Sequence, residues 1–437
     1  MKNKKEPLIG VVDTNGTKFN FLLENYRAIF MSLDNSFIDL HGEFVYGRTN
    51  QYHDIAIYKG EKDIRFSKSQ HLNTSAYVIS TSNMSLADLT TFDSIEFRGG
   101  TLNKVFFCHA LKQSGVASSP NNFYYDAKSD CETYEFETEE GICKVTIGSA
   151  INEHFGIDGV SFSNNTVRFI LEFDAPQNLI SLFDHISKIK EMLALLTFRK
   201  NVGFDEIYIH RGNVTDGLEA QVFLKESISF TEKGIMNSIT FHDVREAIPK
   251  ILYRIYHTKD NEPSYDFGFL PSSDNDVFLM TNNKIRMICS ALECELSFIP
   301  SLCLEESEDL RELIKNVKKT IKDYRKGANR LSAKTYDLIF SSIDHWSMSA
   351  SDKFCELYHQ YEEELLVASD NIISDDSIAQ LVKYRNKITH GSYRVMDSDI
   401  AATAYVLSGL VYCAFLTRVG VSKENILRLC QEHKLLR

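Results

Sequence analysis

Three residues near the C-terminus have side-chain types that could carry out acid–base chemistry on a phosphate. The sequence reads RNKITH from Arg385 to His390, and Asn386 follows the arginine directly. Because an imidazole has an ordinary pKa near 6.5, a pair of imidazoles could deprotonate a ribose 2′-hydroxyl and protonate the leaving 5′-oxygen. A guanidinium could neutralise the charge that builds up on the phosphate oxygens. Asn386 could orient the imidazole or hold the phosphate.

Spacing alone does not single out this pair. An arginine followed by a histidine five or six positions later occurs four times, as Arg48/His53, Arg65/His71, Arg385/His390 and Arg428/His433. Only Arg385 is followed by an asparagine, and only His390 precedes a glycine suited to end a helix. The alternative is structural, because Arg and His near a helix C-terminus stabilise its dipole by about 0.3–1 kcal/mol without any chemistry.

Helical geometry limits how the pair could work. Five residues along a straight helix turn through about 140°, so Arg385 and His390 would lie on different faces. Asn386 and His390, four apart, would share a face. Convergence on one phosphate therefore requires His390 to leave the helical path near Gly391, or a second chain to complete the site. A two-fold dimer with its axis beside residues 385–390 would place two copies of each side chain around one cleft.

The elements that must position these residues are helical. Apolar residues recur at three- and four-residue spacing after residue 277 and predict an all-α bundle over residues 278–437. The expected helices are 278–299, 308–326, 332–346, 350–369, 375–390, 397–419 and 422–434. The most apolar stretch, 404–421, carries Ser408, Thr417 and Arg418, so we interpret it as a buried core helix rather than a membrane span.

The preceding sequence predicts a different kind of structure. Residues 1–165 are rich in turns and short runs of Ile, Val, Phe and Tyr, as in an antiparallel sandwich-like or barrel-like sheet. Residues 166–275 predict an α/β continuation and linker, with an amphipathic helix starting near Pro176 and a short helix near 243–257. The Pro-, Ser- and Asp-rich segment 257–276 is the expected domain boundary. We therefore expect an α+β multidomain protein.

Charge differs between these regions. The 437 residues have a net charge of −12, which argues against general coating of nucleic acid. Residues 280–437 hold 21 Lys and Arg against 22 Asp and Glu, and the rest holds 27 against 38, so the acidity lies in the N-terminal region. No apolar segment follows the basic N-terminus, and the nine cysteines lack CxxC spacing. We therefore expect a cytoplasmic protein with reduced thiols and no metal site.

One helix of the bundle has a basic face. Arg311, Lys315, Lys318, Lys322 and Arg325 recur three or four residues apart and would share one side of the helix. This side is either an ordinary solvated face or a surface that attracts the phosphates of RNA, to which Lys387 beside the motif would add. Glu293, on the first helix of the bundle, could reach Arg385 or be merely exposed.

RNKITH resembles the motif of the HEPN superfamily, whose ribonuclease members carry Arg, a polar residue, a short spacer and His. KIRMICSALECELSF is similar to the family's first helix, and LSGLVYCAFLTRVGVSKENI to the helices after the motif. The two-part architecture resembles the ApeA-like anti-phage proteins of bacteria. The resemblance implies a dimeric endoribonuclease without metal or cofactor. It would stay silent until phage infection and then cut RNA, such as tRNA anticodon loops, with the N-terminal region sensing a phage component or restraining the enzyme.

Two other interpretations remain open at this point. A HEPN-like bundle could have no catalytic role and serve to dimerise or to bind a partner. Alternatively, the main function could lie in the β-rich region, as a ligand- or carbohydrate-binding domain in which Tyr46, Tyr52, Tyr124 and Tyr125 line a groove.

Overall fold

The computed structural model of the protein divides into two compact units, Met1–His257 (unit 1) and Thr258–Arg437 (unit 2). The division falls at the start of the Pro-, Ser- and Asp-rich segment 257–276. The structure describes residues 6–14, 17–33, 37–61, 64–81, 88–106, 111–113, 123–125, 131–138, 141–156, 159–212, 218–225, 244–257, 265, 267–273, 276, 279–299, 308–327, 331–344, 349–369, 371–391 and 395–433.

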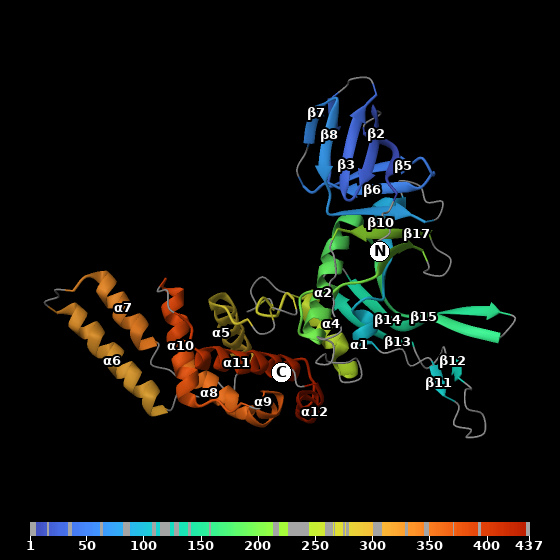
Figure 1. The fold of residues 1–437 in the computed structure, drawn as a ribbon. Coiled ribbons are helices and arrows are strands. Elements are labelled where there is room, and N and C mark those ends of the chain that lie inside the picture. Colours follow the sequence, from blue (N-terminus) through green and yellow to red (C-terminus); the bar gives the residue numbers. More distant parts are fainter. Residues whose placement is uncertain are drawn as a thin grey trace. The chain divides into compact units, whose positions relative to one another are not determined.

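Unit 1 is built on one antiparallel sheet, which has 13 strands among the described residues (Figure 1). Its order is β13-β14-β15-β10-β16-β17-β9-β6-β5-β1-β2-β3-β8, and β11 pairs with β12 and β4 with β7 in two small separate sheets. The strands are β1 (Leu8–Thr14), β2 (Thr17–Glu24), β3 (Arg27–Ser32), β4 (Phe37–Leu40), β5 (Phe44–Thr49), β6 (Asp54–Tyr58), β7 (Ile64–Ser67), β8 (Ser69–Asn73), β9 (Ala76–Ser80), β10 (Thr91–Arg98), β11 (Leu111–Gln113), β12 (Phe123–Tyr125), β13 (Glu132–Thr138), β14 (Gly141–Gly156), β15 (Gly159–Asn178), β16 (Glu206–Arg211) and β17 (Leu218–Leu224).

Alternating apolar residues give this sheet its core. In β2, Phe19, Phe21 and Leu23 are buried while the residues between them are only half-buried, as a period of two requires. Phe30 of β3 and Ile55 of β6 join the same cluster. Fully burying one such side chain contributes roughly 1.5–3 kcal/mol, so this cluster is a main source of stability for the first half of unit 1.

The helices of unit 1 are α1 (Leu102–Val105), α2 (Leu182–Thr197) and α4 (Ile248–Tyr256), with 3₁₀ turns at Asp88–Thr90, Leu179–Ser181 and Arg245–Ala247. The expected amphipathic helix is α2, and its Ile189, Leu193 and Leu196 are fully buried. Its first turn does not contain Pro176, which lies in strand β15. Asn178 instead caps the 3₁₀ turn Leu179–Ser181 that precedes α2, because its Oδ1 accepts a hydrogen bond from the Ile180 amide at 3.0 Å.

Unit 2 is helical, and its elements follow the expected ranges closely. They are α5 (Asn282–Ser297), α6 (Glu308–Lys326), α7 (Ala333–Asp344), α8 (Ala350–Gln360), α9 (Glu362–Ser369), α10 (Asp375–Thr389), α11 (Ser398–Arg418) and α12 (Lys423–His433). The expected helix 350–369 is in fact two helices that meet at Tyr361. The ring of Tyr361 is buried and its hydroxyl donates to Thr417 Oγ1 at 2.7 Å, so a contact distant in sequence accompanies the break.

Helix α11 is the core of unit 2. It packs on α5, α8, α9, α10 and α12, and its residues from Val406 to Leu416 are all buried. Among the described residues it is the one helix whose length and composition would allow it to cross a membrane. Its packing within unit 2 supports the interpretation as a core helix. Helices α6 and α7 pack on each other.

Candidate active site on helix α10

The sequence of α10 fixes which of its residues face outward. The helix begins at Ser374, whose Oγ accepts a hydrogen bond from the Ser377 amide at 3.2 Å. Ile378, Leu381, Tyr384 and Ile388 form its buried stripe, against α5, α8 and α11. The remaining faces are left for the motif residues, which occupy the last two turns.

Arg385 is held by two polar neighbours. Its Nη2 lies 2.7 and 2.6 Å from the two carboxylate oxygens of Glu293 on α5, and its Nη1 donates to Asn386 Oδ1 at 3.1 Å. The Arg385 side chain is 22% exposed and that of Glu293 42%, so solvent reaches the ion pair. Of the two alternatives for Glu293, the structure therefore shows contact with Arg385.

His390 is exposed at the end of the helix. Its amide still donates to the Asn386 carbonyl at 3.1 Å, so the helical path continues to His390 and turns away only at Gly391, whose φ is +83°. Within the described part of the chain, the imidazole makes no hydrogen bond. Because the helix does not bend earlier, Arg385 and His390 remain about 140° apart around its axis. One chain alone does not bring them to one side.

Arg286 of α5 is a further cation at this place, and sequence reasoning did not select it. Its guanidinium donates to the carbonyl of Ile388, in the last turn of α10. One helical turn earlier on α5, Asn282 accepts a hydrogen bond from the Tyr384 hydroxyl at 2.9 Å. A signal was present, because Arg286 and Glu293 are seven residues apart and share a face of α5. We name Arg286, Glu293, Arg385, Asn386 and His390 the α10 site.

A cysteine beneath the α10 site is not suited to act as a nucleophile. Cys289 of α5 is buried, and burial raises the pKa of its thiol to about 12, although the nearby charge of Arg385 opposes this rise. A thiol with such a pKa is protonated at neutral pH, and the thiolate is the reactive form. The chemistry available at this place is thus that of the imidazole and the guanidiniums.

The basic residues expected to bind RNA lie in two places. Lys387 is exposed in the last turn of α10, next to the motif. Lys315, Lys318, Lys322 and Arg325 lie on α6, where Lys318 is half-buried and the other three are exposed. The Arg325 guanidinium lies 5.3 Å from the centre of the Tyr336 ring of α7. Since α6 packs mainly on α7, its basic face belongs to a different part of unit 2 from the helices that hold Arg385.

One residue in each of two other arginine–histidine pairs, Arg48 and His71, has a structural partner. Arg48 binds the buried carboxylate of Asp54 through Nε at 2.7 Å, and His71 contacts Arg27 at 3.0 Å. The side chains of Arg65 and His433 lie outside the described residues. Of the tyrosines proposed to line a groove, Tyr46 is half-buried and Tyr52 is 84% exposed, whereas the side chains of Tyr124 and Tyr125 are also outside the described part.

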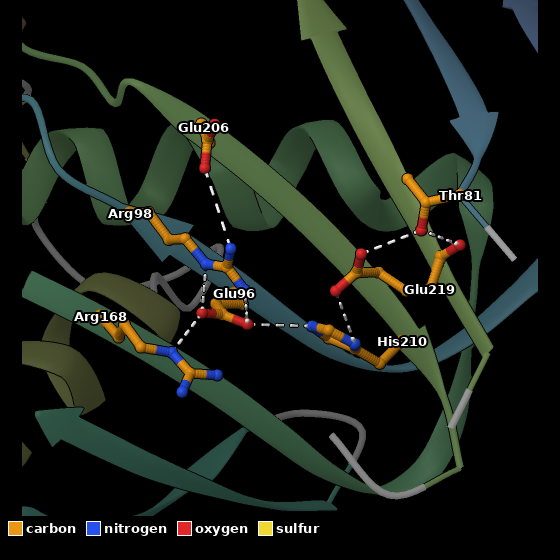
Figure 2. Close-up of polar contacts among 7 residues, drawn as sticks. All are labelled: Thr81, Glu96, Arg98, Arg168, Glu206, His210 and Glu219. Carbon is orange, nitrogen blue, oxygen red and sulfur yellow. Dashed lines mark hydrogen bonds and ion pairs between the residues drawn. The ribbon is translucent and has the colours of Figure 1, made fainter. Parts of the chain in front are cut away.

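Unit 1 contains a buried polar cluster that sequence reasoning missed (Figure 2). Glu96 of β10 is fully buried and accepts hydrogen bonds from Arg98 at 2.6 and 3.1 Å and from Arg168, while His210 lies 3.2 Å away. Glu219, which accepts from Thr81 at 2.9 Å, lies 4.0 Å from the other nitrogen of His210.

The charge of Glu96 is fixed by these neighbours. Burial raises its pKa, but the hydrogen bonds from His210, Arg98 and Arg168 together outweigh burial and hold the pKa far below the ordinary range. A carboxylate that stays ionised cannot exchange protons near neutral pH. The cluster therefore ties β10, β15 and β16 together by charge and is a weaker candidate for catalysis than the α10 site.

Comparisons with protein-family models, curated proteins and solved structures give no significant match for this chain.

Proposed function

We propose that the protein is a metal-independent endoribonuclease that acts in anti-phage abortive infection, with its active site at the α10 site and shared between two copies of the chain. The observation that carries the proposal is the combination of an exposed imidazole, His390, with a guanidinium, Arg385, that Glu293 and Asn386 hold at the same helix end. These are the groups required for attack of a ribose 2′-hydroxyl on the adjacent phosphate.

The reaction divides proton transfer between two imidazoles. The His390 of one copy removes the 2′-hydroxyl proton as the 2′-oxygen forms a bond to phosphorus. The protonated His390 of the other copy gives its proton to the 5′-oxygen as the bond between that oxygen and phosphorus breaks. The products are a 2′,3′-cyclic phosphate and a 5′-hydroxyl, and both imidazoles have exchanged protonation states. Arg385 stabilises the added negative charge on the phosphate oxygens.

A second copy supplies what one chain lacks. Arg385 and His390 lie on different faces of α10, and each chain has only one histidine in the motif. A two-fold axis beside the last turn of α10 places the His390 of one copy next to the Arg385 of the other. In this arrangement Glu293 and Asn386 are positioning residues, because they act on the substrate through Arg385.

The substrate we expect is looped single-stranded RNA, such as the anticodon loop of a tRNA. A 2′-hydroxyl attacks in line only where the strand can splay, which a paired strand resists. Lys387 and the basic face of α6 would contact phosphates along the strand. The acidic unit 1 would oppose capture of RNA by its negative field until a phage component binds.

Cleavage of RNA by the purified full-length protein tests this proposal. We expect cuts that leave cyclic phosphates, persist in a chelator, and stop when the scissile ribose is 2′-deoxy. His390→Ala and Arg385→Ala should abolish cleavage, whereas His71→Ala, which alters an exposed histidine of unit 1, should not. Equal cleavage by the wild type and His390→Ala would exclude the α10 site as the active site. Since the proposal includes activation by a phage component, the same set is also compared in infected cells by sequencing RNA ends.

A non-catalytic role is the second candidate. It is favoured by the engagement of Arg385 with Glu293, since such an ion pair also occurs where it only joins two helices. On this interpretation unit 2 dimerises or binds a partner protein. Protection against phage that persists in both Arg385→Ala and His390→Ala, but is lost when the exposed surface of unit 2 is altered, would support it.

A further inference from the structure

Unit 1 contains two adjoining pockets that share Lys190 and Leu224. The larger has a volume of about 370 Å³, and its apolar wall includes Phe183, Ile186 and Leu224. The smaller has a volume of about 200 Å³ and is lined by Tyr26, Asp205, Glu206 and Gln221, among others. Together they have the combination typical of small-molecule sites, which is an apolar wall with a few polar groups.

The pockets form where two neighbouring strands separate. β16 and β17 pair from Arg211↔Leu218 to Ile207↔Val222. Beyond that point Asp205 remains with the end of β10 and the turn after it, because the Asp205 amide donates to the Arg98 carbonyl at 3.0 Å and Asp205 Oδ2 accepts from the Gly100 amide at 2.7 Å.

The other strand continues in a different direction. β17 follows β9 to Leu224↔Ala76, and the Lys225 amide donates to the Ser75 carbonyl at 2.8 Å. The Tyr26 hydroxyl also donates to the Leu224 carbonyl. The space opened between the two strands is lined by Lys190 of α2. Because hydrogen bonds tie each of the two diverging strands to a different neighbour, the backbone itself maintains the space between them.

The charged residues differ between the two pockets, apart from Lys190, which lines both. Both charged residues that line the larger one, Lys190 and Lys225, are cationic. The Lys190 side chain is half-buried where it lines both pockets, and this burial lowers its pKa. An anion bound between Lys190 and Lys225 would make charge-assisted contacts with both side chains. The smaller pocket contributes acceptors instead, the carboxylates of Asp205 and Glu206 and the side-chain oxygen of Gln221.

The apolar wall of the larger pocket is held in place by aromatic packing. The Phe183 ring stacks on Phe44 with centres 5.9 Å apart and contacts Tyr58 with centres 4.5 Å apart. A wall fixed in this way can bind a flat or apolar group without having to become ordered first, which reduces the entropic cost of binding.

We propose that the two pockets are one binding site for a nucleoside monophosphate. The phosphate binds between Lys190 and Lys225, and the nucleoside lies along the wall of Phe183, Ile186 and Leu224. The amino group of the base donates to Asp205, Glu206 or Gln221 in the smaller pocket. This site gives unit 1 a small-molecule ligand, and it is independent of whether unit 2 cleaves RNA.

Calorimetric titration of the full-length protein tests the site. AMP, CMP, GMP and UMP are compared with inorganic phosphate and adenosine, in the absence of RNA. We expect micromolar binding of the nucleotides with an amino group on the base, and binding at least about tenfold weaker for UMP, phosphate and adenosine. Phosphate binding as tightly as AMP would show a general anion site and overturn the proposal, as would no binding of any nucleotide.

Matched variants locate the binding. Lys190→Met and Lys225→Met should each weaken AMP binding by at least about tenfold, because each removes a charge-assisted contact to the phosphate. Lys188→Met is the control on the same helix, since the Lys188 ammonium lies 2.8 Å from Asp184 and 4.5 Å from the Tyr256 ring centre, away from both pockets. Each variant is first checked by thermal unfolding, and Lys225→Met, an exposed position, serves if Lys190→Met does not fold.

The variant Arg385→Ala tests whether AMP binds at the α10 site instead of the two pockets. This variant should bind AMP as the wild type does, because its change lies in unit 2. Loss of AMP binding in Arg385→Ala with no change in Lys190→Met or Lys225→Met would assign the nucleotide to the α10 site and overturn the proposal.

Discussion

Arg385 and Glu293 meet across 92 residues of sequence, with the Nη2 of the arginine within hydrogen-bond distance of both carboxylate oxygens. This contact uses one nitrogen of the guanidinium, and Nη1 is bound to Asn386. Nε makes no hydrogen bond to any described residue. A phosphate could therefore be bound by Arg385 while Glu293 keeps the guanidinium in place.

Replacing Glu293 with glutamine should slow RNA cleavage without unfolding the protein. A partly exposed ion pair contributes at most about 1 kcal/mol, which corresponds to a loss of about fivefold in rate. The kcat of purified Glu293→Gln is the measurement, with thermal unfolding in parallel. The pH dependence of kcat should not move, because the imidazoles still transfer the protons. Glu356→Gln, at an exposed position on α8, is the control. Full activity in Glu293→Gln would show that Arg385 needs no positioning.

Mixing wild-type and His390→Ala chains should reveal a shared site. If each reaction needs the imidazoles of two copies, only dimers of two wild-type chains are active, and equal co-expression leaves about one quarter of them. The measurement is the specific activity of co-expressed chains at several ratios, which should fall with the square of the wild-type fraction. A linear fall would show that each chain works with its own histidine.

Loss of Arg286 should weaken both the end of α10 and the activity. The Arg286 guanidinium is bound to the Ile388 carbonyl, two residues before His390, and it compensates the negative end of the helix dipole. Arg286→Ala should increase hydrogen exchange in the last turn of α10 and reduce RNA cleavage. Arg286→Lys, which keeps the cation, should recover part of both. Unchanged exchange and unchanged cleavage in Arg286→Ala would remove this residue from the site.

The helices of unit 2 were predictable because local residues mark their ends. Thr281, Ser374 and Asp397 each accept a hydrogen bond from an amide in the first turn of the helix that follows. Apolar spacing supplies the remaining information. The break at Tyr361 was not predictable, since it involves a hydrogen bond to Thr417 on another helix.

Strand pairing was much less accessible from the sequence. The antiparallel character of the sheet follows from short strands with close turns, but its order depends on contacts between distant segments. β17, for example, pairs with β9, so that Phe223 lies opposite Tyr77. Pro176 was assigned to a helix because it suits a first turn, yet proline also fits an irregular place in a sheet, and the pairing of β15 with β10 shifts register between Glu172 and Gln177.

Only part of the α10 site could be read from the motif. Arg385, Asn386 and His390 were selected from the sequence because of their residue types, their neighbours and the resemblance of RNKITH to a known motif. Glu293 was named from the sequence as a residue that could reach Arg385, and the structure contains this contact. Arg286 was missed because its partner is a backbone carbonyl, which no side-chain pattern marks, and because its seven-residue spacing from Glu293 on α5 was not followed up. The pockets around Lys190 were missed because the separation of β16 and β17 depends on long-range pairing.

Removing Arg418 should destabilise unit 2 strongly. Its guanidinium binds both oxygens of Glu295, which is fully buried, at 2.8 and 2.6 Å. Arg418→Met leaves that carboxylate buried with the Tyr265 hydroxyl as a neutral partner, and breaking such a pair costs about 3–5 kcal/mol. Urea unfolding of unit 2 measures the change. The double variant Arg418→Met/Glu295→Gln removes the buried charge and should recover part of the loss. A single variant as stable as the wild type would contradict the assignment.

Protonation of His185 should make unit 1 less stable in acid. The ring is buried, its Nδ1 lies 3.1 Å from the Tyr256 hydroxyl, and Nε2 is buried without a hydrogen-bond partner among the described residues. Burial, assisted by the charge of Lys188, lowers the pKa of His185 to about 4, and Asp184 opposes this only weakly. As the pH falls, the unfolded chain takes up the proton near 6.5, before the folded chain does.

The direction and size of this effect follow from the two pKa values. The contribution of His185 is fully present above about pH 6.5 and is lost as the pH falls to about 4, by about 3 kcal/mol in total. Carboxylates also titrate in this range, so the measurement is a difference. Urea unfolding of unit 1 in the wild type is compared with His185→Gln, which cannot titrate but can still bond to Tyr256. The variant should lose less stability over this window. Parallel curves would mean that the His185 ring takes up its proton in the folded protein as readily as in the unfolded chain.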